Sequence, residues 1–349
     1  MVQSSGYAAQ SKDQPLAPFN FERRTLREND VFIEIQFCGV CHSDIFLARD
    51  GWKKSTYPMV PGHEIVGIVK EIGAKVEKFK VGDHVGVGVM VDSCQKCSSC
   101  QEHLEQYCEK GNVSTYNGKD YHTGEMTYGG YSNNIVVREE FVLSLPGNLD
   151  LAASAPLLCA GITTYSPLKH WKVGSGSEVG IVGLGGLGHM AVKLAKAMGA
   201  KVHVFTTSEG KKEDAKQLGA DHVILSKNSQ EMEGGANSLD LIINTVGAPI
   251  ELEPYLNCLK RDGSMVMVGL PDDLHPPFPI ASLVFQRKCL AGSLIGGIKE
   301  TQEMLDFCGE HNIVSEIELI EIQKINEAFD RTEKGDVRYR FVIDLKSLT

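Results

Sequence analysis

Four cysteines in a short stretch carry the clearest chemical signal in this chain. They follow the spacing Cys94-x2-Cys97-x2-Cys100-x7-Cys108. Four thiolates complete the tetrahedral shell of a zinc ion and leave no position open for a substrate, so the spacing predicts a structural zinc site. An iron–sulfur cluster is the main alternative, but bacterial ferredoxin runs place the fourth cysteine after three residues and follow it with proline. Here the last gap is seven residues and Glu109 follows, so zinc is the better prediction.

A second group of metal-ligating residue types lies between Cys38 and Glu64, where the chain reads CGVCHSD and later PGHE. Thiolates and imidazoles are common zinc ligands, which makes Cys41 and His63 candidates. By itself, however, a histidine in a glycine turn is more often structural. Cys159 lies far downstream in an apolar Leu-Leu-Cys-Ala run, where a core cysteine is the more common case. Spacing alone does not pair it with the other two.

A glycine-rich turn, Gly183-Leu184-Gly185-Gly186-Leu187-Gly188, follows a predicted strand and opens a predicted helix. In dinucleotide-binding folds the first glycine makes the tight turn, the second lets the backbone approach the pyrophosphate, and the third lets the helix pack closely on the sheet. The N-terminus of the helix offers unpaired N–H groups to the phosphates. In this strand–turn–helix context the motif predicts a bound nicotinamide dinucleotide.

The end of the next predicted strand bears on which nicotinamide cofactor binds. An acid about 20 residues past the glycines would hydrogen-bond the ribose 2′-hydroxyl of NAD. The strand ends instead at Thr206-Thr207-Ser208, with Lys211 and Lys212 just beyond. Hydroxyls and cations suit a 2′-phosphate, so we predict NADP(H), held by these hydroxyls and by Lys212. The alternative is that both lysines are ordinary solvated residues. The nearby Glu209 leaves NAD as a second candidate cofactor.

Length, charge and composition exclude several classes of protein. The chain has 349 residues, enough for two domains, and a formal net charge of -10. An acidic surface repels phosphate backbones, so we expect no nucleic-acid partner. No apolar run is long enough to span a bilayer, and the N-terminus lacks a signal-peptide pattern, so we expect a cytoplasmic protein with no membrane partner. The remaining cysteines are expected to be small buried hydrophobes: Cys38, Cys258, Cys289 and Cys308.

The rhythm of predicted elements changes near residue 155. Before it, alternating and valine-rich segments predict a β-rich domain, with strands at 31–37, 64–70 and 84–91 and a turn at 82–83. After it, strands alternate with helices, which predicts an α/β fold with a Rossmann-type, doubly wound parallel sheet. Its predicted strands are 178–182, 201–205, 239–244 and 265–270, its helices are 189–198 and 213–218, and the C-terminal tail adds a helix at 300–308 and a strand at 339–345.

Together these motifs resemble those of zinc-dependent medium-chain alcohol dehydrogenases, most closely the cinnamyl-alcohol-dehydrogenase branch. The resemblance covers nearly the whole chain and implies a GroES-like catalytic domain at 1–155 and 292–349, with a Rossmann NADP-binding domain at 156–291. It also implies a homodimer joined near the strand around 288–293. The matching motifs are CGVCHSD at 38–44, PGHE at 61–64, the four-cysteine segment at 94–108 (the lobe), APLLCAG at 155–161, the glycine turn, GSLIG at 292–296 and VRYR at 337–340.

The resemblance assigns the ligands of a second, catalytic zinc to Cys41, His63 and Cys159. Two thiolates and one imidazole leave a fourth position open for water or substrate. Glu64 is implied either as a ligand when substrate is absent or as a neighbour of the metal. Asp44 is implied as the carboxylate that accepts a hydrogen bond from His63 and fixes its tautomer.

For the reaction, the resemblance implies hydride transfer from NADPH to an aldehyde polarised by zinc, with Ser43 donating the proton to the product oxygen. Many relatives carry a histidine five residues after the first ligand cysteine, as the outer end of a proton relay. Phe46 occupies that position here. The relay therefore either runs through the cofactor ribose directly to water or uses His42.

Further residues are implied at the cofactor and in the substrate pocket. Thr163, Val268 and Gly269 match positions beside the nicotinamide, and Arg340 matches an arginine near the pyrophosphate. The implied pocket lining is apolar, which suits aromatic or aliphatic aldehydes: Phe46, Leu47, Trp52, Met59, Met90, Leu294 and Ile295.

The substrate expectation is a broad range of small aldehydes and alcohols. Lignin-type relatives tend to carry glutamine at the position of Leu47 and tryptophan near that of Ser114, and this chain lacks both. One alternative is an NAD-linked alcohol or polyol dehydrogenase. A non-catalytic zinc-binding structural protein is an alternative of another class.

Overall fold

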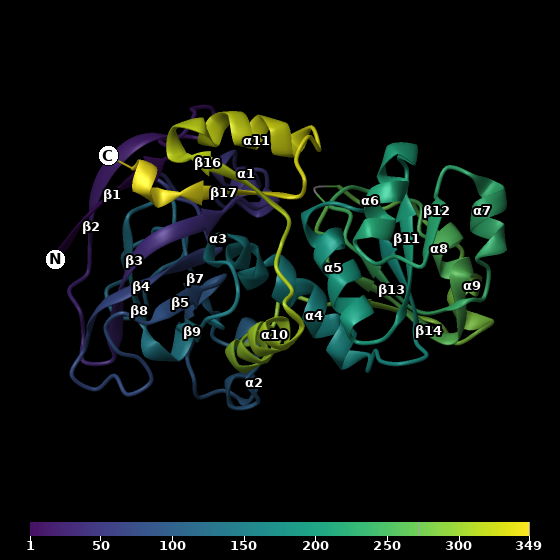
Figure 1. Ribbon diagram of the computed structural model, residues 1–349, viewed down its shortest axis with the longest axis horizontal. Coiled ribbons are helices and arrows are strands. Elements are labelled where there is room, and N and C mark those ends of the chain that lie inside the picture. Colours follow the sequence, from purple (N-terminus) through teal and green to yellow (C-terminus); the bar gives the residue numbers. More distant parts are fainter. Residues whose placement is uncertain (272, 349) are drawn as a thin grey trace. The chain divides into compact units, whose positions relative to one another are not determined.

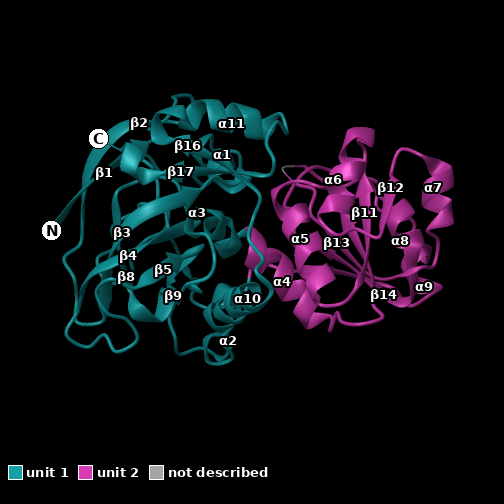
Figure 2. Cartoon of the chain, viewed as in Figure 1, with its two compact units in different colours: residues 1–159, 296–349 teal, residues 160–295 magenta. Residues whose placement is uncertain are grey.

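The computed structural model describes residues 1–271 and 273–348, and the chain forms two compact units (Figure 1). Unit 1 comprises residues 1–159 and 296–349, and unit 2 comprises residues 160–295 (Figure 2). The first unit therefore ends at residue 159 rather than 155, and the second at residue 295 rather than 291. The shift assigns Cys159 to unit 1, together with the other cysteine- and histidine-rich motifs.

Unit 1 is built on a mostly antiparallel seven-stranded sheet. Its main path runs β16-β17-β3-β4-β5-β9, and β8 also pairs with β3. Side chains of β3 alternate, with Val31, Ile33 and Ile35 buried, as the half-buried pattern predicted. The strands are β1 (Val2–Ala8), β2 (Ala17–Arg23), β3 (Asp30–Gly39), β4 (Ile65–Ile72), β5 (His84–Val87), β6 (Met90–Asp92), β7 (Val113–Ser114), β8 (Asn134–Arg138), β9 (Leu143–Ser144), β16 (Ile317–Glu321) and β17 (Arg340–Asp344).

The helices of unit 1 are mostly short and lie in the connections between strands. The longest, α10, turns Met304, Leu305 and Cys308 into the core and ends at Asn312, whose left-handed conformation stops it. The helices are α1 (His42–Ala48), α2 (Ser98–Gln101), α3 (Leu151–Ser154), α10 (Ile298–His311) and α11 (Ile325–Glu333).

Unit 2 confirms the predicted doubly wound α/β fold. Its six parallel strands follow the order β12-β11-β10-β13-β14-β15. Strands β11 and β12 are added on one side of β10, and β13, β14 and β15 are added on its other side. This order places the carboxyl ends of β10 and β13 next to each other at a switch point, where such folds bind ligands. The elements are α4 (Ala160–His170), β10 (Glu178–Val182), α5 (Gly186–Ala197), β11 (Lys201–Thr206), α6 (Lys212–Gln217), β12 (His222–Leu225), α7 (Ser229–Gly234), β13 (Leu239–Asn244), α8 (Glu253–Cys258), β14 (Leu259–Met267), α9 (Ala281–Val284) and β15 (Cys289–Gly292).

Two of the predicted strands were wrong in their extent. The predicted strand 84–91 breaks into β5 and β6, because Thr115 binds the carbonyl groups of Gly88 and Val89 at 2.5 and 3.0 Å and draws them out of the ladder. The predicted strand 265–270 starts earlier, as β14, and ends at Met267. Beyond it, the N–H groups of Val268 and Gly269 both turn to the carbonyl oxygen of Asn244.

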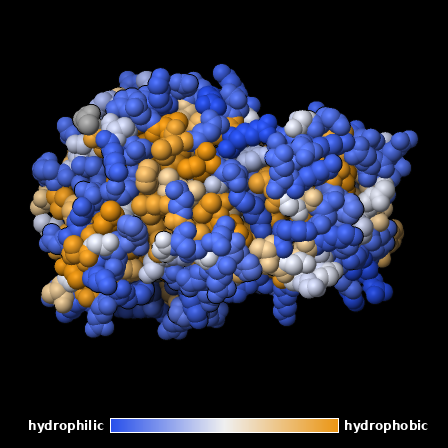
Figure 3. Space-filling view, viewed as in Figure 1, coloured by the Kyte–Doolittle hydropathy of each residue, from blue (hydrophilic) through white to orange (hydrophobic). Residues whose placement is uncertain are grey.

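The face of the molecule seen in Figure 3 is largely hydrophilic, with hydrophobic residues in patches between the polar ones. Of the scattered cysteines, Cys38, Cys258 and Cys308 are buried as expected, but Cys289 is exposed on the edge strand β15, so that expectation was wrong. Among the described residues, no helix combines the length and the apolar character that a membrane crossing requires.

Candidate active site and metal centres

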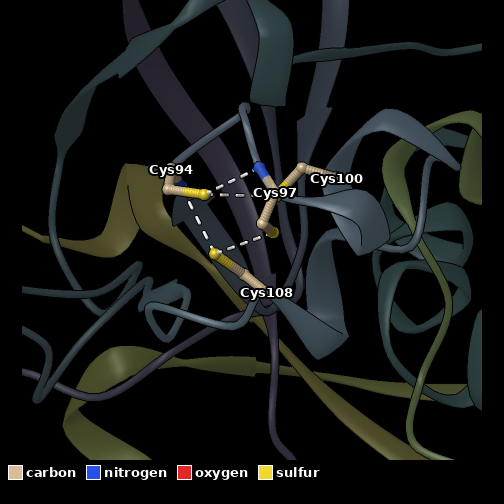
Figure 4. Close-up of side chains that lie close together, drawn as sticks. All are labelled: Cys94, Cys97, Cys100 and Cys108. Atoms are coloured by element: carbon tan, nitrogen blue, oxygen red, sulfur yellow. Dashed lines mark hydrogen bonds between the residues drawn. The ribbon is translucent and has the colours of Figure 1, made fainter.

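The four cysteines of the predicted structural site converge on one point (Figure 4). The sulfurs of Cys94 and Cys100 are 3.9 Å apart and those of Cys97 and Cys108 are 4.0 Å apart. A tetrahedral zinc ion with bonds of about 2.3 Å separates its sulfurs by roughly 3.8 Å, so the spacing fits the ion. The N–H groups of Cys94 and Cys97 each point at a cluster sulfur at 3.4 Å. The backbone N–H groups of Lys96 and Cys97 lower the pKa of Cys94 to about 6, which favours the thiolate that binds metal.

The lobe also contacts the N-terminus of α10, a helix far downstream in the chain. Glu105 lies in a tight turn, Glu105–Tyr107, between the third and fourth cysteines. Its Oε2 accepts a hydrogen bond of 3.0 Å from the N–H of Ile298, in the first turn of α10. Gly297 has no room for a side chain, because an added Cβ would lie 1.8 Å from the carbonyl oxygen of His103. The lobe and the N-terminus of α10 therefore fit closely together.

A second cluster, fully buried, is assembled from three separate segments of unit 1. Cys41 follows β3 and caps α1, His63 and Glu64 come directly before β4, and Cys159 ends the short turn after α3. Antiparallel pairing of β3 with β4, with Cys38 opposite Ile65, brings the first two segments together. Ligand atoms of Cys41, His63, Glu64 and Cys159 all lie within 4.8 Å of one another.

Three features of this buried cluster fit a metal ion. The sulfurs of Cys41 and Cys159 are 3.8 Å apart, the separation expected around a tetrahedral zinc. Both carboxylate oxygens of Glu64 are buried without a hydrogen-bond partner, a costly state that a cation would relieve. Gly39 leaves the space for that carboxylate, because a Cβ at Gly39 would lie 1.9 Å from Glu64 Oε2.

Asp44 orients the cluster from within α1. Its Oδ1 lies 2.9 Å from Nδ1 of His63 and accepts the N–H of Gly62 at 3.1 Å, and its Oδ2 accepts the N–H of Cys41 at 2.9 Å. An Nδ1 proton directed at this carboxylate leaves Nε2 of His63 as the ligand atom. The ring of Tyr116 stacks on His63 with centroids 5.9 Å apart, which further limits ring rotation.

Burial, hydrogen bonds and neighbouring charges shift the pKa values of all four cluster residues. The hydrogen bond to Cys159 lowers the pKa of Cys41, and the same contact, with burial, raises the pKa of Cys159. Burial lowers the pKa of His63, but Asp44 and Cys41 more than offset this and leave it well above its ordinary value. Burial raises the pKa of Glu64 to about 7, although the charge of Arg340 acts in the opposite direction.

Arg340 lies at this cluster rather than in a solvent-exposed position. It is buried, its Nη2 lies 3.6 Å from Glu64 Oε1, and its Nη1 donates to the carbonyl oxygen of Val40 at 3.2 Å. Sequence reasoning did not anticipate this ion pair. Its predicted contact with the cofactor pyrophosphate stays a prediction, and its Nε is a buried donor without a protein partner.

In unit 2, the glycine turn has the geometry that its sequence predicted. Gly183 directly follows β10 and has a φ of 91°, a conformation that favours glycine. Gly185 faces open space, with no atom within 4 Å of an added Cβ, so a ligand can approach its backbone closely. At Gly188 an added Cβ would lie 2.1 Å from the carbonyl oxygen of Gly183, which shows how tightly the first turn of α5 packs on the strand end.

Comparison with known proteins agrees with this combination of sites. Residues 27–147 match the model of the alcohol dehydrogenase GroES-like domain, and residues 186–310 match that of the zinc-binding dehydrogenases. The aldehyde reductase YahK of Escherichia coli K12 is 54% identical over 98% of this chain and 98% of its own. The chain belongs to the zinc-dependent medium-chain alcohol dehydrogenases.

Two solved structures locate this alcohol dehydrogenase within its family. A cinnamyl alcohol dehydrogenase from Sorghum bicolor superposes with a TM-score of 0.96 and 44% identity, covering 99% of this chain and 98% of that one. The CAD of Helicobacter pylori, solved in complex with NADP(H), gives a TM-score of 0.93 and 48% identity over 99% of both chains. The dehydrogenase is thus an oxidoreductase of the cinnamyl-alcohol-dehydrogenase-like branch, with a GroES-like unit 1 and a Rossmann unit 2.

The two lysines after β11 of this dehydrogenase have different surroundings. Nζ of Lys211 donates to the carbonyl oxygen of Leu184 in the glycine turn at 2.9 Å. Lys212 is paired with Glu209 at 3.0 Å and Glu231 at 3.8 Å, and its contact with the 2′-phosphate stays a prediction. Of the predicted hydroxyl residues, Thr206 is buried, whereas Thr207 and Ser208 are exposed beyond the strand. Sequence alone could not separate Lys211 from Lys212, because they are adjacent and alike.

Other predicted site residues fall into both units. Ser43 is half-buried on α1, and Thr163 is buried on α4 of unit 2. Val268 and Gly269 leave the carboxyl end of β14 beside that of β13, on the edge of the sheet where the glycine turn also lies. Their roles at the cofactor and in proton transfer stay predictions.

The predicted pocket residues are also divided. The rings of Phe46 and Trp52 pack together with centroids 5.4 Å apart, and Trp52 Nε1 is buried without a partner. Met59 and Met90 are almost fully buried in unit 1. Ile295 ends unit 2 with a φ of 37°, an unusual backbone conformation for a β-branched residue.

Proposed function

We propose that this dehydrogenase catalyses the NADP(H)-linked interconversion of small aldehydes and alcohols, with broad specificity for aromatic and aliphatic substrates. The observation that carries the proposal is the buried set of Cys41, His63 and Cys159, beside which the carboxylate of Glu64 has no hydrogen-bond partner. Two thiolates and an imidazole form a zinc shell with one open position, whereas the four-cysteine lobe forms a closed one. The enzyme would therefore hold two zinc ions per chain with different tasks.

The ion held by this set would supply Lewis acidity, which polarises a carbonyl group. The surrounding residues then have separate tasks. Asp44 keeps His63 in one tautomer, and we assign the proton transfer to the hydroxyl of Ser43, two residues after Cys41 on α1. Phe46 cannot carry a proton, and its ring is packed between those of His42 and Trp52 at 5.2 and 5.4 Å. A relay in this enzyme must therefore bypass position 46.

Preference for NADP(H) is supported by the chemistry at the end of β11. The two exposed hydroxyls of Thr207 and Ser208, and the ammonium group of Lys211 at the glycine turn, suit a 2′-phosphate. Glu209, the one feature favouring NAD, forms an ion pair with Lys212. The related enzyme solved with NADP(H) adds support.

Specificity is proposed to be broad because the expected lining is apolar and lacks a dedicated polar handle. The relatives also bear the names of different reactions, an aldehyde reductase and a cinnamyl alcohol dehydrogenase. A cytoplasmic location, expected from the sequence, stays a prediction.

A homodimer joined through unit 2 is part of the proposal. The strand β15 forms one edge of the six-stranded sheet, and an unpaired strand edge is a template for pairing with a second copy. Large hydrophobic side chains are exposed in the segments around it, which is typical of an interface. They are Leu270, Leu274, Ile280, Val284, Phe285 and Leu294.

The decisive experiment measures kcat/KM with NADPH and NADH across a panel of aromatic and aliphatic aldehydes, together with zinc content per chain. We expect a preference for NADPH of about ten- to a hundredfold, the value of one or two charge-assisted hydrogen bonds. Lys211→Ala should reduce the rate with NADPH and not with NADH, whereas the control Lys216→Ala, an exposed residue of α6, should change neither.

Each competing function has its own outcome. Faster turnover with NADH would favour an NAD-linked alcohol or polyol dehydrogenase. One zinc per chain and no turnover of any aldehyde would leave a structural zinc protein. For the dimer, Phe285→Glu should yield monomers by size-exclusion chromatography with light scattering, and Val81→Glu, at an exposed site of unit 1, should not.

A further inference from the structure

We propose that Tyr131 is a positioning residue for the metal ligand His63, and that it acts through Asp44. The inference rests on the proposed catalytic zinc site. The supporting observation is a hydrogen bond of 3.1 Å that the Tyr131 hydroxyl donates to Oδ2 of Asp44, two side chains buried in unit 1.

The four donors around Asp44 come from two kinds of structure. Three of them, the N–H groups of Cys41 and Gly62 and the ring of His63, belong to the ligand-bearing turns themselves. They move with the cluster and cannot define its position independently. Of these four donors, the Tyr131 hydroxyl is the one that comes from a segment carrying no ligand.

Tyr131 is well anchored to act as that external reference. Its segment, residues 129–131, binds the turn before His63 by three backbone hydrogen bonds: from residue 129 to Val60 at 2.7 Å, from 130 to Gly62 at 2.9 Å and from 131 to Pro61 at 2.9 Å. Gly62 has a φ of 106°, and an added Cβ there would lie 2.7 Å from Cδ1 of the Tyr131 ring. The tyrosine thus packs directly against the turn that presents His63.

A buried arginine secures the same segment from the other side. The guanidinium of Arg23 donates to the carbonyl oxygens of Tyr128 and Gly129 at 2.7 and 2.9 Å, and to the hydroxyl of Ser132 at 2.9 Å. Its guanidinium carbon also lies 5.0 Å from the centroid of the Phe21 ring, and its described contacts include no carboxylate ion pair. These contacts involve no metal ligand, so they do not depend on a bound ion.

The consequence for the metal follows from the chain of hydrogen bonds. A carboxylate partner orients a ligand imidazole, and a donor to that carboxylate limits the motion of the carboxylate in turn. Without the hydroxyl, Asp44 loses one of four hydrogen bonds in a buried site and can rotate, and the Nε2 atom of His63 then moves away from its ligand position more readily. The effect should appear in metal retention, not only in turnover.

The test replaces Tyr131 by phenylalanine in the zinc-loaded enzyme and follows zinc transfer to a chromogenic chelator. The wild-type enzyme should release zinc in two phases, one from each site. In Tyr131→Phe the phase from the catalytic site should accelerate about three- to tenfold, the range expected for one hydrogen bond. The phase from the four-cysteine lobe should not change. With cobalt in the catalytic site, the visible bands should shift, since ligand geometry changes.

Tyr57→Phe is the matched control. Its hydroxyl donates to the carbonyl oxygen of Ala48 at 2.9 Å, so its removal weakens the C-terminal end of α1 without touching the Asp44 carboxylate. It should leave zinc release and the cobalt spectrum unchanged. Equal acceleration in both variants, acceleration of both zinc phases, or release within twofold of wild type in Tyr131→Phe would overturn the inference.

A double variant tests the route through Asp44. Asp44→Asn alone should accelerate release about ten- to a hundredfold, as expected for a direct partner of a ligand histidine. Adding Tyr131→Phe to it should then have little further effect, because coupled residues are not additive. Full additivity would show that Tyr131 acts by another route. A wild-type enzyme that releases zinc in a single phase would instead remove the proposed catalytic site itself.

Discussion

The two candidate metal sites of unit 1 offer similar ligand atoms but are assembled in opposite ways. The lobe takes four sulfurs from one short stretch, residues 94–108, and two of its cysteines are half-exposed. The buried cluster takes its atoms from three segments, with Cys41 and Cys159 separated by 118 positions, and all four members are buried. One is a local feature that organises a loop, and the other is a product of the whole fold of its unit.

Their surroundings differ in the same sense. In the lobe, the backbone N–H groups of neighbouring residues point at the sulfurs and stabilise thiolates locally. In the buried cluster, charge balance depends on Asp44 and Arg340, which belong to α1 and β17. A site that relies on distant elements can be tuned by them, and it also fails when any of them moves.

The largest effect separates the two clusters by activity. Cys159→Ala should lower kcat/KM by about 10³-fold or more, since the lost Lewis acid contributes several kcal/mol to the transition state. Zinc analysis should show one ion left, in the lobe. Cys38→Ala is the control, because Cys38 is buried on β3 but does not belong to the cluster, and it should keep two ions. Loss of both ions in Cys159→Ala would mean that the two sites depend on each other.

The next effect reverses the pattern. Cys100→Ser should release the lobe zinc and cost about 4 kcal/mol or more of local stability, as loss of a structural metal does. Limited proteolysis should then cut within residues 93–108, while the freshly prepared enzyme keeps its catalytic zinc and most of its turnover. Cys289→Ser, at an exposed cysteine outside both clusters, should behave like wild type. Immediate loss of turnover in Cys100→Ser would contradict the division of tasks.

A third prediction concerns the cost of burying an empty site. Without metal, the pKa of Glu64 is raised to about 7 by burial, above its unfolded value, so the protonated form favours the folded state. Folded stability should therefore fall as pH rises from about 4.5 to 7, by at most about 3 kcal/mol. Glu64→Gln should remove this fall in the metal-free protein.

Thermal midpoints of both proteins at pH 5.5 and 8, with chelator present, provide the measurement for Glu64. The advantage of Glu64→Gln should be greater at pH 8. An equal difference at both pH values would show that the carboxyl group of Glu64 does not titrate in this range. The lobe provides no such pH-dependent penalty from a buried carboxyl group, since its ligands are all sulfurs.

The smallest effect tests how the lobe communicates with the rest of unit 1. Glu105→Ala removes the acceptor for the N–H of Ile298 at the start of α10, and losses of helix-terminal acceptors cost about 1 kcal/mol. The thermal midpoint should fall by a few degrees with both zinc ions retained. A larger fall accompanied by loss of the lobe zinc would show that this contact stabilises the metal site as well as the helix.

The contrast between the clusters also explains what could be predicted from the sequence. The four-cysteine lobe, the glycine turn and strands such as β10 and β13 depend on residues close together in the chain, and their patterns are visible there. Pairing Cys159 with His63 needs the sheet that brings them together, so only the resemblance to a family supplied it. Tyr131 gave no signal, because one tyrosine after two glycines has no spacing that indicates a role.

Where local patterns failed, a contact from elsewhere in the chain was decisive. The strand predicted at 84–91 is interrupted because Thr115 binds two of its carbonyl groups. Lys211 and Lys212 are equivalent by composition, and only the turn after β11 directs one to the glycine turn and the other to two glutamates.

Cys159 is the last residue of the first segment of unit 1, and Ala160 begins unit 2. Every sulfur, imidazole and carboxylate of the two clusters thus belongs to one module, and the nucleotide-type glycine turn belongs to the other. A recombination event with breakpoints after residues 159 and 295 would exchange the redox-carrier module whole and leave the inorganic chemistry intact.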